Sequence, residues 1–106
     1  MLYREKVILG LGGGRDGDGV VMPPRSANYR AEVAALSSEE MQQRGRNPSS
    51  VAYRVTLPRL KAGDKITAAS TITWRGTTYQ VLGKPMQYTI AGRFHHIEVI
   101  AVHATG

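Results

Sequence analysis

Short stretches of alternating apolar and polar residues, separated by turn residues, fill the chain from Val51 to His103. The clearest is Val51–Leu57, where every second residue is apolar and its neighbours are mostly polar or small, as in a half-buried β-strand. Parallel strands need crossovers of about a dozen residues, usually helical. The stretches here are too closely spaced for that, so the sequence predicts a mainly β fold, a small antiparallel barrel or sandwich.

The same alternation predicts further strands and a core. Strands are expected over Tyr3–Leu9, Val20–Met22, Asn28–Leu36, Ile72–Trp74, Tyr79–Gly83 and His96–Val102. Arg75-Gly76-Thr77 predicts a tight hairpin turn, and Gly83-Lys84-Pro85 predicts a strand end because proline has no N–H for a ladder. Apolar residues occupy both faces of the last strand, so we expect it to be covered on both sides. The expected core comprises Val33, Tyr53, Val55, Ile72, Trp74, Tyr79, Val81 and Val99.

The segment 28–46 is compatible with two secondary structures. Alternation from Tyr29 to Ala35 fits a strand, while Tyr29, Val33 and Leu36 also share one face of a helix. Ser37 followed by Glu40 forms a capping-box pattern, which belongs at a helix start. We therefore expect a strand to Leu36 and one short helix over 38–44, inside a long loop of residues 37–50. Residues 10–19 are rich in glycine and predict a second flexible loop.

Length and composition limit the class of protein. A chain of 106 residues is sufficient for a single domain, residues 1–106. It contains no cysteine, which excludes disulfides and Cys-based zinc sites. No stretch approaches the roughly 20 apolar residues that cross a bilayer, so no membrane association is expected. A net charge of +6 favours anionic partners, although the basic residues are scattered and also fit a solvated surface.

No motif for catalysis or for a cofactor is complete. Gly10–Arg15 resembles a dinucleotide-binding loop, but Arg15 takes the place of its third glycine and no helix pattern follows. His95 and His96 are adjacent, so on a strand they point to opposite faces unless a bulge intervenes, whereas His96 and Glu98 share a face. Two ligands make a weak metal site. We expect no catalytic residue, no metal and no cofactor, and the chain is not expected to be an enzyme.

Aromatic and basic residues also raise the alternative of a single-stranded nucleic-acid-binding barrel. Such a protein stacks bases on exposed aromatic rings beside a basic face. The residue types occur at Tyr53, Arg54, Trp74, Arg75, Tyr79 and Tyr88. However, Tyr53, Trp74 and Tyr79 lie on the faces assigned to the core, which favours packing over base stacking.

Four segments together carry a resemblance to a known family: Tyr29–Glu40, Val51–Leu57, Ile72–Val81 and Ile97–Val99. They reproduce the order of an Ala-x-Val strand, a Ser-x-x-Glu helix start, a strand, a hairpin with an apolar-x-Gly-x-x-Tyr-x-Val core, and an apolar final strand. In this order the chain resembles the head-tail joining proteins of tailed bacteriophages, which include adaptors, stoppers and head-closure proteins.

The resemblance implies a structural protein of the virion, located at the head-tail interface and assembled in the host cytoplasm. Its subunits would form a homo-oligomeric ring that closes the DNA-filled head, with portal or adaptor proteins above and tail proteins below. The loop after the second strand would face the channel and its packaged double-stranded DNA without reading sequence. Its members here are Arg44, Gly45, Arg46 and Asn47. A tail-terminator or tail-tube subunit is the related alternative.

Overall fold

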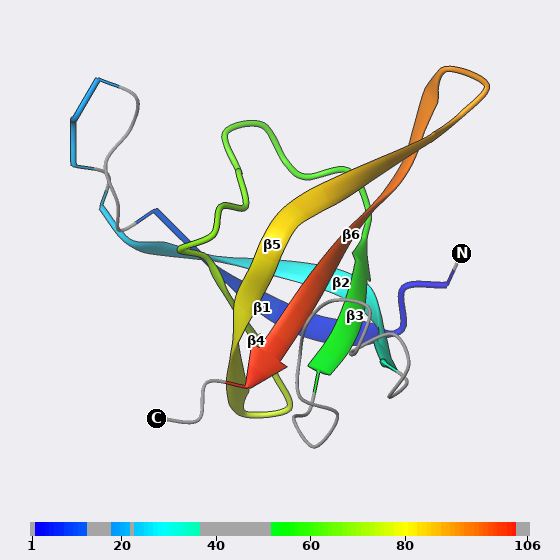
Figure 1. Ribbon diagram of the computed structural model, residues 1–106, viewed down its shortest axis with the longest axis horizontal. Coiled ribbons are helices and arrows are strands. Elements are labelled where there is room, and N and C mark those ends of the chain that lie inside the picture. Colours follow the sequence, from blue (N-terminus) through cyan, green and yellow to red (C-terminus); the bar gives the residue numbers. More distant parts are fainter. Residues whose placement is uncertain (1, 13–17, 22, 37–51, 104–106) are drawn as a thin grey trace.

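Six antiparallel strands close into a barrel in the computed structural model, which describes residues 2–12, 18–21, 23–36 and 52–103 (Figure 1). The strands are β1 (Glu5–Leu11), β2 (Arg25–Ala35), β3 (Ala52–Leu57), β4 (Thr71–Trp74), β5 (Thr77–Ile90) and β6 (Arg93–His103). Around the barrel their order is β1-β2-β3-β6-β5-β4. The predicted mainly β, antiparallel barrel is therefore confirmed. The helix expected over 38–44 lies outside the described residues.

Alternation along the strands separates the barrel interior from its outer surface. In β1, Val7, Leu9 and Leu11 are buried in the core, while Lys6 and Ile8, which alternate with them, are exposed. Burial of such apolar side chains contributes roughly 1.5–3 kcal/mol each and is the main force that closes the sheet. Of the expected core residues, Val55, Ile72, Tyr79, Val81 and Val99 are buried, and Val33, Tyr53 and Trp74 are partly buried against them.

A second, smaller hydrophobic cluster lies on the outside of the barrel. It consists of Leu36, Ala52, Ile100 and Val102, with Leu82 packed against it. Ile100 and Val102 alternate with Val99 and Ala101 of the main core, so β6 is covered on both faces, as the sequence predicted. The Leu36 N–H donates to the Ala52 carbonyl at 3.1 Å. This bond holds together the two ends from which the segment 37–51 leaves and returns.

Two hairpins have two-residue turns with positive φ at both positions. Arg75 and Gly76 have φ values of 51° and 79°, and Ala91 and Gly92 have 51° and 75°. This is the type I′ geometry, whose twist matches that of antiparallel strands. The predicted turn at Arg75-Gly76-Thr77 is confirmed.

Strand β5 extends beyond its expected end at Gly83-Lys84-Pro85, so that prediction was wrong. The pairing register between β5 and β6 shifts between Leu82 and Met86, which leaves Pro85 in an irregularity where no ladder N–H is required. Strand β6 correspondingly begins at Arg93, before the expected His96. The hairpin turn at Ala91-Gly92 allows the two strands to continue pairing beyond the barrel.

Strand ends near the first loop also differ from the sequence prediction. Gly10 and Leu11 belong to β1 and not to the glycine-rich loop, because Gly10 pairs with Ser26 on one side and Thr71 on the other. A Cβ at Gly10 would lie 2.2 Å from the Thr71 Oγ1 atom, so any other residue here would require the Thr71 hydroxyl to move. The expected strand over 20–22 is reduced to an isolated bridge at Val21, and Met22 lies outside the described residues.

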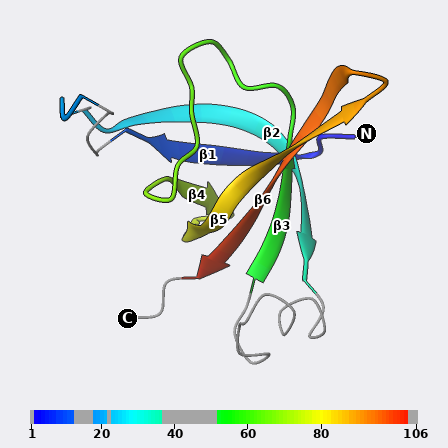
Figure 2. The same ribbon diagram turned by 45° about the horizontal axis from the view of Figure 1, so that its top comes forward.

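One part of the β5–β6 hairpin projects from the barrel, and we call residues 84–96 the arm (Figures 1 and 2). Strand β4 pairs with β5 only over 77–80, and β3 pairs with β6 only from Ile97 onward. Beyond these points β5 and β6 pair only with each other. The arm lies at the barrel end that also carries the loop between β3 and β4, whereas Leu36 and Ala52 lie at the opposite end, since neighbouring strands are antiparallel.

Candidate interaction surfaces

Two cations lie directly opposite each other on the outer face of the barrel. Lys6 of β1 is the register partner of Arg30 in β2, and Ile8 is the partner of Asn28. These residues line a shallow recess of about 490 Å³ together with Tyr29. Within the described ranges neither cation has an ion pair. Like charges directly opposite on a sheet are destabilising, so this surface, the cationic face, is suited to an anion supplied from outside.

Uncharged hydrogen-bonding groups extend the cationic face onto β4 and β5. Ile8 pairs with Thr73 across the β1–β4 ladder, and Thr73 pairs with Thr78 of β5. The two threonine hydroxyls are 3.0 Å apart and hydrogen-bonded. Residues paired directly across antiparallel strands share a face of the sheet, so the cations, the exposed Ile8 and the hydroxyls lie on one surface.

A polar network anchors the loop between β3 and β4 to the barrel. The Tyr29 hydroxyl accepts the Lys61 N–H at 2.8 Å and donates to the Asp64 carboxylate. Arg25 donates to the same carboxylate at 2.5 Å and to the Gly63 carbonyl at 2.9 Å. The Asp64 side chain is only 5% exposed, so the network supplies the hydrogen bonds that water would otherwise make to this carboxylate.

This network shifts the proton affinities of its members. The hydrogen bond from Tyr29, then that from Arg25, lowers the pKa of Asp64 below its usual value. Burial, then the hydrogen bond to Asp64, raises the pKa of Tyr29. Asp64 therefore stays ionised as an acceptor and Tyr29 stays neutral as a donor. Both groups are occupied in holding the loop, which fits a structural role.

Acid is expected to weaken the fold through Asp64. A lowered folded pKa means that the native state favours the carboxylate, so this stabilisation is present above the unfolded pKa of about 3.9 and is lost as pH falls through the folded value. The free energy of unfolding, measured by urea titration across this pH range, should decrease as the pH is lowered. Asp64→Asn should flatten the dependence, and Tyr29→Phe should flatten it in part. An unchanged slope in the Asn variant would contradict this assignment.

Aromatic rings close the end of the barrel opposite to the loop between β3 and β4. Tyr53 packs edge-on against Trp74 at 5.0 Å and against Tyr79 at 5.5 Å between ring centroids. The Trp74 indole N–H donates to Glu5 at 2.8 Å, and this bond, followed by the Arg75 charge, lowers the pKa of Glu5. Arg75 also covers the Trp74 ring, with its guanidinium carbon 4.7 Å from the ring centroid. The ring centroids of Trp74 and Tyr79, on the two strands of the β4–β5 hairpin, are 6.4 Å apart. The rings thus contact one another, which leaves little open ring face for a base.

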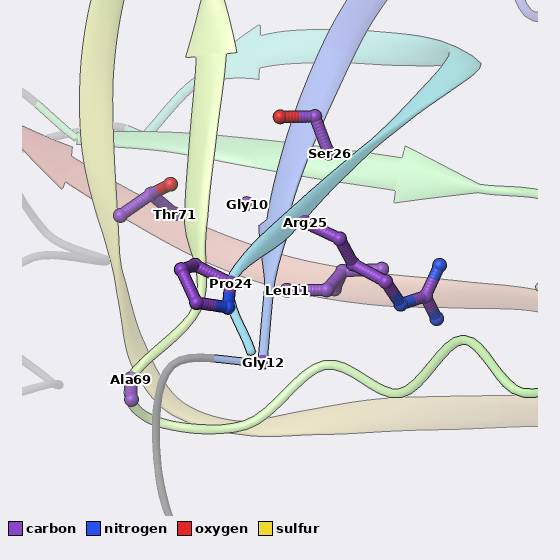
Figure 3. Close-up of a pocket in the computed structure, with 8 residues that line it drawn as sticks. All are labelled: Gly10, Leu11, Gly12, Pro24, Arg25, Ser26, Ala69 and Thr71. Carbon is purple, nitrogen blue, oxygen red and sulfur yellow. The ribbon is translucent and has the colours of Figure 1, made fainter. Parts of the chain in front are cut away.

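A second recess, of about 390 Å³, lies where β1 ends and β2 begins (Figure 3). Its lining is mainly small or apolar, and Figure 3 shows the Arg25 guanidinium directed away from Thr71 and Ala69. That guanidinium is engaged with Asp64. The recess therefore lacks the convergent polar groups that a small-molecule site requires.

A β-bulge in the arm brings the side chains of the adjacent residues His95 and His96 together. Tyr88 pairs with His96 and Thr89 with Phe94, which leaves His95 as the extra residue. The Nδ1 atoms of His95 and His96 are 2.7 Å apart, and His96 Nε2 lies 3.0 Å from Glu98. His96 and Glu98 thus share a face, as predicted. Nowhere in the described part of the chain do three or more His, Cys, Asp or Glu residues form a metal-binding group.

The interaction residues that the sequence predicts differ from those that the structure indicates. The candidate channel-facing residues Arg44, Gly45, Arg46 and Asn47 lie outside the described residues. The cationic face was missed, because the pairing of Lys6 with Arg30 requires the register between β1 and β2. The alternation in β1 and β2 does place Lys6 and Arg30 at outward positions, and this was the signal in the sequence that could have suggested the cationic face.

The described residues include no helix that is long and apolar enough to span a membrane. No protein-family model matches this chain, and no curated protein matches it in sequence.

Proposed function

We propose that this protein is a structural subunit of the phage head-tail connector that forms a ring, closes the DNA-filled head and joins it to the tail. The observation that carries the proposal is the cationic face, where Lys6 and Arg30 oppose each other and, among the described residues, neither has an ion pair. Such a surface suits contact with the phosphates of double-stranded DNA in a channel, which needs charge and no base readout.

Two further features support a building-block role. In the closed barrel each of the six described strands pairs with two neighbouring strands, so it suits a rigid unit. The segment 37–51, which contains the candidate channel-facing residues, departs from one barrel end between the hydrogen-bonded Leu36 and Ala52. Its attachment to the barrel is therefore fixed, as a ring subunit that directs a loop into a channel requires.

Assembly is the test of this proposal. The purified chain should form rings in negative-stain electron micrographs, either alone or when mixed with portal rings from the same phage. Analytical ultracentrifugation over a concentration series should show the matching oligomer. A chain that stays monomeric throughout and binds no portal ring refutes the proposal. Binding to purified tails in place of portal rings would instead identify a tail-terminator or tail-tube subunit.

Lys6→Glu is expected to have opposite effects on stability and on DNA binding. Opposite charges would then face each other at Arg30, so the free energy of unfolding should rise by about 0.5 kcal/mol. Affinity for a double-stranded DNA fragment should fall, and the slope of log K against log salt should decrease in magnitude by about 0.9 for each phosphate that the protein no longer neutralises. Urea unfolding and salt-titrated anisotropy measure the two effects.

Lys65→Glu is the matched control, since it makes the same charge change in the loop between β3 and β4, at a residue that does not line the recess of the cationic face. It should leave the salt slope close to that of the wild type. If both variants weaken DNA binding equally, only net charge matters and the cationic face does not bind DNA.

The single-stranded nucleic-acid-binding alternative has a separate readout. It requires base stacking on Trp74, which would quench the indole fluorescence in a salt-dependent way. The contacts of Trp74 with Tyr53, Glu5 and Arg75 favour the connector. Strong quenching by an oligonucleotide would favour the alternative.

A further inference from the structure

The arm is a two-stranded ribbon with free backbone edges. Beyond Val81, whose N–H reaches the Ser70 carbonyl at 3.4 Å, β5 makes no described backbone contact on its outer side. An edge strand leaves a row of N–H and C=O groups unpaired, which can pair with an additional strand. Figure 2 shows the arm extending away from the barrel, so this edge is open to a partner.

The two edges of the arm are not equally accessible for pairing. On β6 the bulge at His95 interrupts the edge, and on β5 the irregularity at Lys84-Pro85 does the same near the barrel. The stretch Met86–Ile90 of β5 is the longest regular edge that remains. Its Tyr88 is 39% exposed and its Ile90 is 60% exposed. This edge therefore offers both backbone groups and apolar side chains.

Charge on the arm has one sign. From Lys65 to Ile97 the chain contains no Asp or Glu, while Lys84 and Arg93 lie within the arm. The Arg59 guanidinium lies 4.6 Å from the centre of the Phe94 ring, close to the turn of the arm. The first acidic residue after the arm, Glu98, is already bound to Arg54 and His96. Nothing in the described surroundings of Lys84 and Arg93 neutralises them.

We propose that the arm is a docking edge for an extended acidic segment of another protein, which adds as a third strand beside Met86–Ile90. Main-chain hydrogen bonds would provide affinity, and alternate side chains would provide selectivity. Ile90 pairs directly with Arg93, so Tyr88, Ile90 and Arg93 share one face of the arm. On that face, apolar residues in the middle of the segment would pack on Tyr88 and Ile90, and carboxylates at its two ends would lie near Lys84 and Arg93.

Two other occupants fit the arm less well. A second copy would bring its own cations to the same edge, and its described carboxylates are already engaged. Glu5 contacts Trp74, Glu32 the Leu2 N–H, Asp64 Arg25 and Glu98 Arg54, and Asp18 also has a partner. Lysine and proline on an edge are also recognised barriers to self-pairing. Nucleic acid has phosphates but no amide edge, so it would use neither the free backbone groups nor Ile90.

Binding of a designed peptide tests the proposal on the full chain. The probe is a fluorescently labelled peptide with neutralised termini and the sequence Glu-Thr-Val-Thr-Val-Thr-Glu, which as a strand places both Val and both Glu side chains on one face. Two control peptides have Lys in place of Glu, or the same residues in blocked order. Anisotropy should show binding of the acidic peptide, with affinity at least about tenfold higher than for either control. Hydrogen exchange should slow at residues 86–90 upon binding.

Variants of the chain locate the site. Arg93→Glu and Ile90→Ser should each weaken peptide binding by about fivefold to tenfold, the effect of removing one charge-assisted or apolar contact. Lys65→Glu is the control outside the arm and should change binding less than twofold. Thermal melts of each variant verify that the barrel is intact, and hydrogen exchange of the wild type gives an independent readout if a variant fails to fold.

Several outcomes would overturn the proposal. They are equal affinity for the acidic and blocked-order peptides, binding that is insensitive to Arg93→Glu, or protection outside the arm. Self-association that Ile90→Ser abolishes, without peptide binding, would identify a second copy as the occupant. DNA binding that Arg93→Glu abolishes, again without peptide binding, would identify nucleic acid. Peptide binding and hydrogen exchange at residues 86–90 do not require ring formation. The arm proposal can therefore fail while the connector role stands, and the connector role can fail while the arm proposal stands.

Discussion

Leu9→Ala should lower the free energy of unfolding by about 3–4 kcal/mol, the cost of removing buried methyl groups and leaving a cavity. Leu9 is among the largest fully buried side chains, with 0% exposure, and lies in β1 between its partners β2 and β4. Small domains have only about 5–15 kcal/mol of stability, so this loss is a large part of the total. Urea denaturation followed by circular dichroism measures it.

Ile8→Ala provides the matched control. Ile8 precedes Leu9 in the same strand but points outward and is 44% exposed. A change at such a surface position should alter stability by no more than about 0.5 kcal/mol. If the two variants lose similar stability, the assignment of inner and outer faces in β1 is wrong, and with it the placement of the cationic face, which depends on the same alternation.

Tyr53→Ala should have the second-largest effect, a loss of about 2–4 kcal/mol, because it removes a large ring from a packed aromatic cluster. Tyr53 contacts Trp74 and Tyr79 edge-on, at 5.0 and 5.5 Å between centroids. It also lies in β3 next to Ala52, which receives the hydrogen bond from Leu36. Loss of the ring should expose Trp74 to water and shift its fluorescence emission to longer wavelength.

Tyr88→Ala is the comparison for this variant. The Tyr88 ring stacks on His96 at 4.6 Å, but it lies on the arm and is 39% exposed. Its removal should cost less than about 1.5 kcal/mol, within the range of an aromatic pair, and should leave the Trp74 emission unchanged. A smaller loss for Tyr53→Ala than for Tyr88→Ala would show that the aromatic cluster does not stabilise this end of the barrel.

The two barrel ends have different chemistry, which is relevant to both proposals. One end carries the aromatic cluster and the attachment points of the segment 37–51. The other carries the arm and the loop anchored by Tyr29 and Asp64. A subunit with distinct surfaces at its two ends can contact different neighbours at each, as a connector between head and tail requires.

Alternation of residue types was sufficient to predict much of this fold. It identified the β class, the approximate positions of the main strands and the two-sided burial of β6, because side chains in a strand point alternately to opposite faces. The Arg75-Gly76 turn was also predictable, since the turn residues have a local requirement for positive φ. These features depend on residues that are close together in the sequence.

Only the tertiary structure decided the features that depend on register between distant strands. Pro85 suggested a strand end, but the register shift between Leu82 and Met86 accommodates it and lets β5 extend into the arm. The opposition of Lys6 and Arg30 and the bond between Tyr29 and Asp64 join residues that no local pattern relates. The sequence by itself determined which face of each strand is apolar, because that is a local property. How the strands pair, and thus which charges meet, followed from closure of the whole barrel.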